Sequence, residues 1–133
     1  MTQKPLIKIV KNMNMKNPKN VIIYARVTSV ENNPLVKEKL EAQLQQCRTY
    51  CEENNLDVMT ELQAFGPEVD EQVQALLQYL HTDTALKHSL SGVIVSDIDR
   101  ISRDSSTLTS FKTDLEAMNM VLYVRNSAAA TTK

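Results

Sequence analysis

The sequence lacks a long hydrophobic run, which limits the cellular locations that we expect for the protein. None of its apolar stretches approaches the roughly 20 consecutive residues that a bilayer-spanning helix requires. The N-terminal region is rich in lysine but has no apolar core of signal-peptide length, because Asn12, Asn14, Lys16 and Asn17 interrupt it. We therefore expect a protein that is located in the cytoplasm and has no membrane partner.

Cysteine and histidine are also scarce, with two of each in 133 residues. Cys47 and Cys51 are four residues apart on a predicted helix, a placement poorly suited to a disulfide, and no second ligand pair accompanies them for zinc. We predict that both thiols are buried. His81 and His88 have no cysteine or paired carboxylate around them, and we expect both at surface or boundary positions. The sequence thus predicts no metal site and no small-molecule cofactor.

Positive and negative residues nearly balance, at a formal net charge of −1, but they are unevenly distributed along the chain. Residues 1–20 carry five lysines and no acid, whereas the remainder has ten basic residues against sixteen acidic ones. A basic arm on an acidic body would suit contact with a nucleic-acid backbone; the alternative is a poorly ordered, solubilising leader. The acidic remainder argues against a large surface for non-specific DNA binding.

The patterning that is present predicts an alternation of strands and helices. Apolar runs predict four strands, over residues 21–27, 56–62, 90–96 and 120–124. Helical spacing predicts helices over residues 35–54, 69–81 and about 108–118, the last capped by Ser105 or Ser106. This order predicts an α/β fold, a three-layer arrangement in which a parallel sheet with right-handed crossovers has helices on both faces.

The length of the chain predicts one domain. We place it at residues 20–126, after a flexible basic arm at 1–19. The tail, residues 127–133, has nothing to bury, and we expect it to be disordered.

Two arginine-centred segments follow predicted strands. The segment Asp99-Arg100-Ile101-Ser102-Arg103-Asp104 follows the apolar run 92–95, and Tyr24-Ala25-Arg26-Val27-Thr28 ends the run 21–23. Ligands of parallel α/β folds collect at the carboxyl ends of the strands. Three guanidiniums and a hydroxyl at that edge suit a phosphodiester, because guanidiniums stay protonated and donate bidentate hydrogen bonds. Arg26 in particular needs a partner, since it lies beside buried valines.

Other interpretations of the second segment are open on the residues alone. Arg100 and Arg103 would also fit the start of a surface helix, with Asp99 and Asp104 as their salt-bridge partners. Asp97 and Asp99 would fit a phosphorylation site of the response-regulator type, but no lysine-bearing fifth strand follows.

At these residues the chain resembles the N-terminal catalytic domain of the serine recombinases, the family of resolvases, invertases and serine integrases. The family's first strand ends in Tyr-x-Arg-x-Ser, similar to residues 24–28, and its third strand leads into Asp-Arg-(Leu/Ile)-x-Arg-Asp, matched by residues 99–104. The family's Ser-Leu-x-x-Gln-like helix segment resembles residues 39–43, and its leucine-rich helix and following strand resemble residues 108–124. The similarity covers roughly residues 20–125.

The resemblance implies a resolvase-like domain of flavodoxin-like topology and a part in site-specific DNA recombination. In that family a serine hydroxyl attacks the scissile DNA phosphate without a metal or cofactor, leaving a 5′-phosphoseryl enzyme and a free 3′ hydroxyl. Strands are exchanged within a tetramer and resealed by the reverse reaction. The implied partners are DNA and other recombinase chains, in a homo- or hetero-oligomer. The implied setting is DNA integration by a mobile genetic element, such as a phage or plasmid.

The resemblance also implies roles for particular residues. It assigns catalysis to Arg26, Thr28, Arg100 and Arg103, because guanidiniums stabilise the charge that gathers on the phosphorane-like transition state. Ser29 is the alternative nucleophile. Supporting positions are Tyr24, which we expect to pack in the core, Asn32, Gln43 and Asp99.

The chain departs from the family pattern at several of these positions, first at the nucleophile. Thr28 stands where the family has serine, and its branched carbon crowds an in-line attack. Ser29 has the simpler hydroxyl, but neighbouring side chains of a strand point to opposite faces, so a loop must turn it inward. The family's glutamine aligns with Asn32 or Asn33. An arginine expected before the second helix falls near Asp70, a carboxylate that would reverse the local electrostatics.

The family's oligomerisation helix and DNA-binding domain have no counterpart here, so we expect this chain neither to choose a DNA site nor to assemble a tetramer unaided. Two functions follow from these patterns. One is a recombinase domain that cuts and rejoins DNA with help from another chain. The alternative is a catalytically inactive homologue, degenerate at the nucleophile, that acts as a binding partner or regulator.

Overall fold

Four parallel strands form the single sheet of the part of the chain that the computed structural model describes, residues 19–29, 33–82 and 89–125. The strands are β1 (Lys19–Val27), β2 (Leu56–Phe65), β3 (Leu90–Val95) and β4 (Val121–Val124). The helices are α2 (Pro34–Glu53), α3 (Val69–Leu80) and α5 (Ser105–Ala117), with a short 3₁₀ turn, η1 (Ile98–Arg100). The predicted alternation of strands and helices is confirmed.

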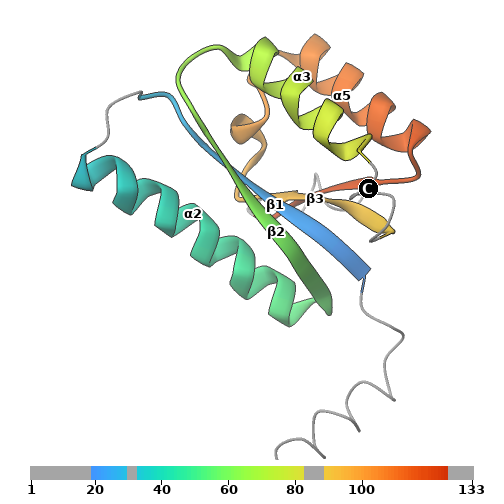
Figure 1. Cartoon of the computed structure of the whole chain (residues 1–133), viewed down its shortest axis with the longest axis horizontal. Coiled ribbons are helices and arrows are strands. Elements are labelled where there is room, and N and C mark those ends of the chain that lie inside the picture. The colour runs from blue at the N-terminus through green and yellow to red at the C-terminus, as the bar shows by residue number, and fades with distance from the viewer. Residues whose placement is uncertain (1–18, 30–32, 83–88, 126–133) are drawn as a thin grey trace, which may run out of the picture.

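The strand order is β2-β1-β3-β4, and every neighbouring pair is parallel. The chain therefore moves in one direction from β1 to β2 and in the other direction from β2 through β3 to β4. Because crossovers are right-handed, this reversal sends α2 to one face of the sheet and α3 and α5 to the other (Figure 1). The predicted three-layer α/β fold with flavodoxin-like topology is confirmed.

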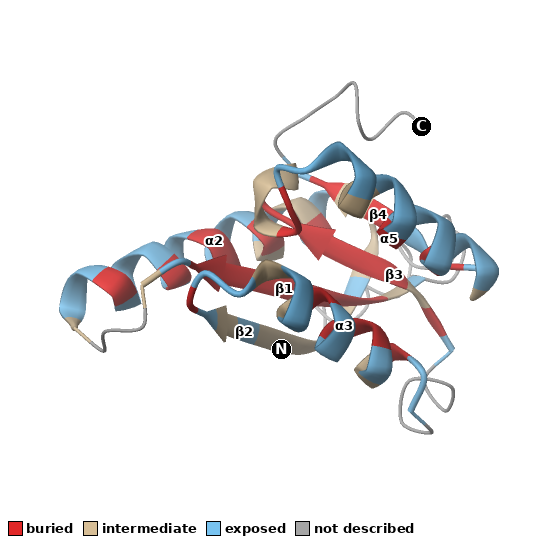
Figure 2. Ribbon diagram, turned by 90° about the horizontal axis from the view of Figure 1, so that it is seen from above, coloured by how far each residue is buried: buried red, intermediate tan, exposed pale blue. Residues whose placement is uncertain are grey.

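Two apolar cores sandwich the sheet, one on each face. Alternate residues of β1 supply each core: Val21, Ile23 and Ala25 face α2, whereas Ile22 and Tyr24 lie in the core beneath α3 and α5. All residues from 21 to 27 are buried, as expected for a strand covered on both faces. Figure 2 shows the buried residues concentrated in the two central strands, β1 and β3, and on the helices where they meet the sheet, whereas the edge strand β2 has no buried residue.

The α2 helix buries its cysteines against the sheet. Cys47 and Cys51 are free and buried, which confirms the prediction for both thiols. Burial raises the pKa of Cys47 to about 12 and that of Cys51 to about 11. The helix begins after Asn33, whose side-chain oxygen accepts a hydrogen bond from the Val36 amide at 3.0 Å.

The cap of α5 differs from the prediction. Asp104, and neither Ser105 nor Ser106, is the N-cap: its carboxylate accepts hydrogen bonds from the amide and hydroxyl of Thr107, at 2.9 and 2.8 Å. These bonds hold the pKa of Asp104 below its usual range. The helix therefore starts at Ser105, earlier than a serine cap would allow. Because the Asp104 carboxylate binds Thr107, it is not the salt-bridge partner that the surface-helix alternative expected.

Several predictions fall outside the described residues, including those for Asn32, His88, most of the basic arm and the tail 127–133. His81 is exposed at the end of α3, as predicted. None of the helices in the described ranges is long and apolar enough to cross a membrane.

Candidate functional site

The candidate site lies where β1 and β3 end, next to each other at the middle of the sheet. The chain leaves β1 toward one edge, while the chain leaving β3 turns toward the other edge. Loops that diverge in this way leave a crevice between them, the usual ligand position in an open parallel sheet. The fold therefore brings the end of β1 and the η1 turn together, although they are more than 70 residues apart in sequence.

Arg26 joins these two segments. Its side chain is on the α3 and α5 side of β1, and the residue is only 6% exposed. The Nε atom donates to the carbonyl of Arg100 at 2.9 Å, and Nη2 donates to the carbonyl of Asp99 at 3.0 Å. The remaining nitrogen, Nη1, is buried without a hydrogen-bond partner among the described residues. The partner that this arginine needs is thus the backbone of η1.

Gln43 holds the same strand end from the opposite face. Its amide oxygen accepts from the Arg26 backbone N–H at 3.0 Å, and its amide nitrogen donates to the Arg26 carbonyl at 2.9 Å. Both bonds are buried, so α2 fixes the backbone of Arg26 while η1 fixes its side chain. This is a positioning role at the place where the resemblance put a supporting glutamine.

The two arginines of the η1 segment each lie near one carboxylate. Arg100 donates from Nη1 to the Arg26 carbonyl at 3.1 Å, and its Nε is 3.7 Å from the nearer oxygen of Asp97. Arg103 lies with its Nε 3.6 Å from an oxygen of Asp99, and its side chain is 86% exposed. The surface-helix interpretation was therefore right about Asp99 as a partner. Ion pairs this long and this exposed contribute little to stability, and at these distances neither Nε atom is hydrogen-bonded to its carboxylate.

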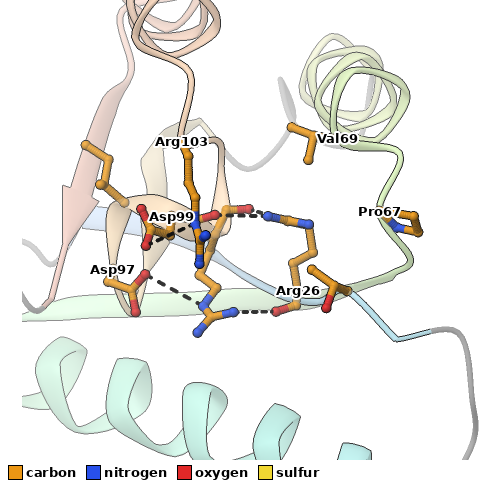
Figure 3. A pocket seen from close by; sticks show the side chains of 9 residues that line it. Arg26, Pro67, Val69, Asp97, Asp99 and Arg103 are labelled. Atoms are coloured by element: carbon orange, nitrogen blue, oxygen red, sulfur yellow. Dashed lines mark hydrogen bonds and ion pairs between the residues drawn. The ribbon is translucent and has the colours of Figure 1, made fainter.

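A cavity of about 770 Å³ opens beside these residues on the α3 and α5 side; we call it the arginine cavity (Figure 3). Three cations and two carboxylates line it, together with a hydroxyl and three apolar residues: Arg26, Arg100, Arg103, Asp97, Asp99, Thr28, Pro67, Val69 and Ile98. No group of three or more His, Cys, Asp or Glu side chains in the described ranges is placed to hold a metal ion. The donors that the cavity offers to a phosphate are N–H groups of arginine.

A second cavity, of about 530 Å³, opens on the α2 side of the same strand end. Its polar lining includes four cations but a single carboxylate: Lys39, Arg100, Arg103, Arg125 and Asp97. Thr28, Ser29, Ser96, Gln43 and Gln46 add hydroxyl and amide groups. We call it the α2-side cavity.

The two candidate nucleophiles lie differently with respect to these cavities. β1 ends at Val27, and Thr28 is exposed and lines both cavities. Ser29 is half-buried and lines only the α2-side cavity. The alternation of side chains along the strand thus persists past its last residue, and Thr28 is the hydroxyl that shares the arginine cavity with Arg26.

Tyr24 and Asp70 line neither of the two cavities. Tyr24 is buried in the core beneath α3 and α5, and its hydroxyl has no hydrogen-bond partner within the described part of the chain. Burial raises the pKa of Tyr24, against an opposing effect of the Arg26 charge. Asp70 lines a different cavity, between α3 and α5, so the carboxylate expected to reverse the electrostatics of the site is not there. Pro67 and Val69 occupy the α3 side instead.

Sequence reasoning missed Lys39 and Arg125 as site residues. Arg125 directly follows β4, so the rule that ligands collect at carboxyl ends would have found it had it been applied to the fourth strand as well. Lys39 lies one helical turn before Gln43 and therefore on the same side of α2.

Comparison with known proteins agrees with this architecture. The family model "Resolvase, N terminal domain" matches residues 21–133. A resolvase family site-specific recombinase from Streptococcus pneumoniae superposes with a TM-score of 0.69 at 19% identity, covering 86% of this chain and 77% of that one. The N-terminal catalytic domain of TP901-1 integrase gives a TM-score of 0.64 at 19% identity, covering 86% and 88%.

A third similar structure is the C-terminal catalytic domain of ISC1926 TnpA, an IS607-like serine recombinase. It gives a TM-score of 0.64 at 20% identity over 82% of this chain and 69% of that one. At these identities the structures establish a shared fold. No curated protein matches the sequence at a significant level.

Proposed function

The chain belongs to the resolvase N-terminal domain family, and on this basis we propose that its arginine cavity binds a DNA phosphodiester which Thr28 attacks. The domain is of the serine-recombinase type, and the process in which it takes part is site-specific DNA recombination. The solved relatives are named as recombinases and an integrase, which supports DNA as the substrate. Other recombinase chains are the proposed protein partners.

The observation that carries this proposal is the unpartnered donor of Arg26. A buried N–H group without a hydrogen bond is costly, on the order of 1–3 kcal/mol, and more for a charged group. Arg26 Nη1 is such a group, and Arg100 Nε at the same cavity also lacks a hydrogen bond, although the Asp97 carboxylate lies 3.7 Å from it. An anion entering the cavity would give both guanidiniums an acceptor, and Thr28 is the exposed hydroxyl beside it.

The proposed reaction is a phosphoryl transfer in two reversible halves. The Thr28 hydroxyl oxygen forms a bond to phosphorus while the bond from phosphorus to the 3′ oxygen breaks, and the proton lost by the hydroxyl is balanced by the one gained by the leaving 3′ oxygen. The product is a 5′-phosphothreonyl ester and a free 3′ hydroxyl, and the reverse step rejoins the strand. Arg26, Arg100 and Arg103 stabilise the charge on the equatorial oxygens.

A second candidate function is a non-catalytic recombinase homologue that regulates an active recombinase. The observation in its favour is that Arg26 already has two internal acceptors, so its presence is explained by the link between β1 and η1 without any catalysis. The branched β-carbon of Thr28 also favours the non-catalytic function, since it crowds an in-line attack on phosphorus. The two functions differ in whether a covalent protein–DNA bond forms.

A covalent-adduct trap separates them. The full chain would be fused to a DNA-binding domain of known specificity and incubated with nicked duplex carrying that domain's sites on both sides of a varied spacer. Wild type, Thr28→Ser, Thr28→Ala and Ser29→Ala would be compared on denaturing gels. We expect an adduct with wild type and Ser29→Ala, a faster one with Thr28→Ser, and none with Thr28→Ala.

The arginine variants test the cavity in the same assay. Arg100→Gln and Arg103→Gln should each slow adduct formation by about 100-fold, the usual effect of removing one donor to a charged transition state. An adduct lost in Ser29→Ala and kept in Thr28→Ala would assign the nucleophile to Ser29. An adduct with Thr28→Ser alone, or with no variant, would favour the non-catalytic homologue.

A further inference from the structure

The α2-side cavity is more strongly positive than the arginine cavity, although the proposed reaction uses only the latter. Four cations and one carboxylate line it, whereas three cations and two carboxylates line the arginine cavity. Its one carboxylate, Asp97, lies 3.7 Å from the Arg100 guanidinium. The remaining positive charge is therefore free to attract an anion.

Two of these cations have side chains without a hydrogen-bond or ion-pair partner in the described part of the chain. The Lys39 and Arg125 side chains are exposed, and neither makes a hydrogen bond or ion pair within the described residues. Lys39 comes from α2 and Arg125 from the end of β4, so the fold brings them to one cavity from elements that are far apart in sequence.

A buried polar group at the same cavity also lacks a partner. Ser96, which directly follows β3, is 2% exposed, lines the α2-side cavity, and has a hydroxyl without a hydrogen bond in the described structure. A buried hydroxyl ordinarily finds a partner. A ligand with oxygen acceptors would satisfy this hydroxyl and the two free cations together.

The two cavities are adjacent to each other. They share four lining residues, Thr28, Asp97, Arg100 and Arg103, so the end of β1 lies between two spaces that each contain more cations than carboxylates. A ligand that carries several phosphates along a chain fits this arrangement better than a single small anion, because it occupies both spaces without leaving the surface.

We propose that the α2-side cavity binds a second phosphate group of the nucleic-acid strand whose neighbouring phosphate lies in the arginine cavity, through Lys39, Arg125 and Ser96. This inference rests on the proposed function for the identity of the strand. It adds a binding subsite whose residues hold the strand in place and do not touch the reacting phosphorus.

The test measures how DNA binding by the full chain depends on salt. Anisotropy of a fluorescein-labelled nicked duplex would be recorded over a series of KCl concentrations, and log K plotted against log salt concentration. Loss of one phosphate contact lowers the magnitude of this slope by about 1. We expect that reduction for Lys39→Gln and for Arg125→Gln.

Matched controls use lysines that line neither cavity. Lys37 is exposed on the same helix as Lys39, and Lys112 is exposed on α5. Lys37→Gln and Lys112→Gln make the same change in net charge, so their slopes should stay at the wild-type value. Circular dichroism melting curves would verify that all four variants fold.

The outcomes separate this inference from the proposed function. Equal slopes for the cavity variants and the controls, or no binding by wild type at the lowest salt, would overturn the second subsite whatever the adduct trap shows. Reduced slopes for the cavity variants alone would support it even if no adduct forms. A titration with inorganic phosphate tests whether the site binds free phosphate instead. If Lys39→Gln and Arg125→Gln lose phosphate binding but keep the wild-type salt dependence of DNA binding, the site binds free phosphate, which contradicts the assignment to nucleic acid.

Discussion

The guanidinium of Arg26, which lines the arginine cavity, donates two hydrogen bonds within the protein, and its third nitrogen has no partner among the described residues. The acceptors are the carbonyls of Asp99 and Arg100, which belong to the short η1 turn. A 3₁₀ turn of three residues has few hydrogen bonds of its own, so these two bonds are a large part of what holds it against β1. The same residue therefore positions the other arginines and contributes a donor to the site.

This dual role predicts that Arg26→Lys destabilises the fold. A lysine ammonium is a point charge on a flexible stem and does not reproduce two donors fixed in a plane. We expect a loss of about 1–3 kcal/mol in the free energy of unfolding, because one carbonyl or the buried charge is left without its partner. Urea unfolding monitored by circular dichroism measures this.

The matched control is Arg103→Lys. Arg103 carries the same group in the same site, but its side chain is 86% exposed and its only described partner is Asp99, at 3.6 Å. Its substitution should change stability by less than about 0.5 kcal/mol. If the two variants were equally stable, Arg26 would not be the link between β1 and η1.

At the level of elements, an ion pair ties α2 to the edge strand β2. Arg48 donates from Nε and Nη2 to the two oxygens of Glu61, at 2.6 and 2.8 Å, and from Nη1 to Glu41 at 2.8 Å. The bonds to Glu61 are bidentate, the geometry in which arginine binds a carboxylate most strongly. They hold the pKa of Glu61 below its ordinary value of 4.5.

A depressed carboxyl pKa makes stability depend on pH in a defined direction. The stabilisation is present above the ordinary pKa of Glu61 and is lost as the pH falls through its lower folded-state value. Because Arg48 and Glu61 are each about a third exposed, we expect only about 0.5–1 kcal/mol. Glu61→Gln should lower stability by that amount at neutral pH and by little in acid.

Urea unfolding at several pH values measures this difference. Glu52→Gln is the control, since Glu52 is an exposed carboxyl on α2, the helix that carries Arg48. Its variant should follow the wild-type pH dependence. A Glu61→Gln curve parallel to that of wild type throughout the acid range would contradict the role given to the ion pair.

For the whole molecule, the two cysteines report on the integrity of the core beneath α2. Both thiols are buried, and their pKa values of about 12 and 11 keep them protonated at neutral pH. The thiolate is the reactive form, so a thiol reagent should reach them only when the molecule opens. We expect negligible labelling in native buffer and two equivalents in denaturant.

The control for thiol labelling is a Thr109→Cys variant, which supplies an exposed thiol on α5 and should gain one rapidly reacting group. Prompt labelling of Cys47 in the native protein would contradict the prediction and show that the α2 core opens locally.

The same thiols make stability depend on alkaline pH. Because both native thiols have pKa values above their ordinary value of 9.0, their contribution to stability is complete below that value and is lost as the pH rises toward 11 and 12. Unfolding midpoints measured between neutral and strongly alkaline pH should fall in this window.

The elements that were predicted well are those with a strong local signal. Val21–Val27 is apolar except for Arg26, and Leu40, Leu44, Cys47 and Cys51 recur at helical spacing, so local pattern alone located β1 and α2. The α5 cap was predicted wrongly because three neighbouring residues, Asp104, Ser105 and Ser106, all suit that position. Backbone geometry rather than residue type chose among them.

The candidate site was likewise predicted in part from the sequence. The order of elements was sufficient to predict that Arg26, Thr28, Arg100 and Arg103 share one edge of the sheet, because parallel strands end on the same side. The sequence by itself thus determined the fold class and the cationic character of that edge. Which groups contact one another depends on side-chain direction across segments more than 70 residues apart. Only the tertiary structure decided that Arg26 binds η1, that Asp70 faces another cavity, and that Lys39, Arg125 and Ser96 line one cavity.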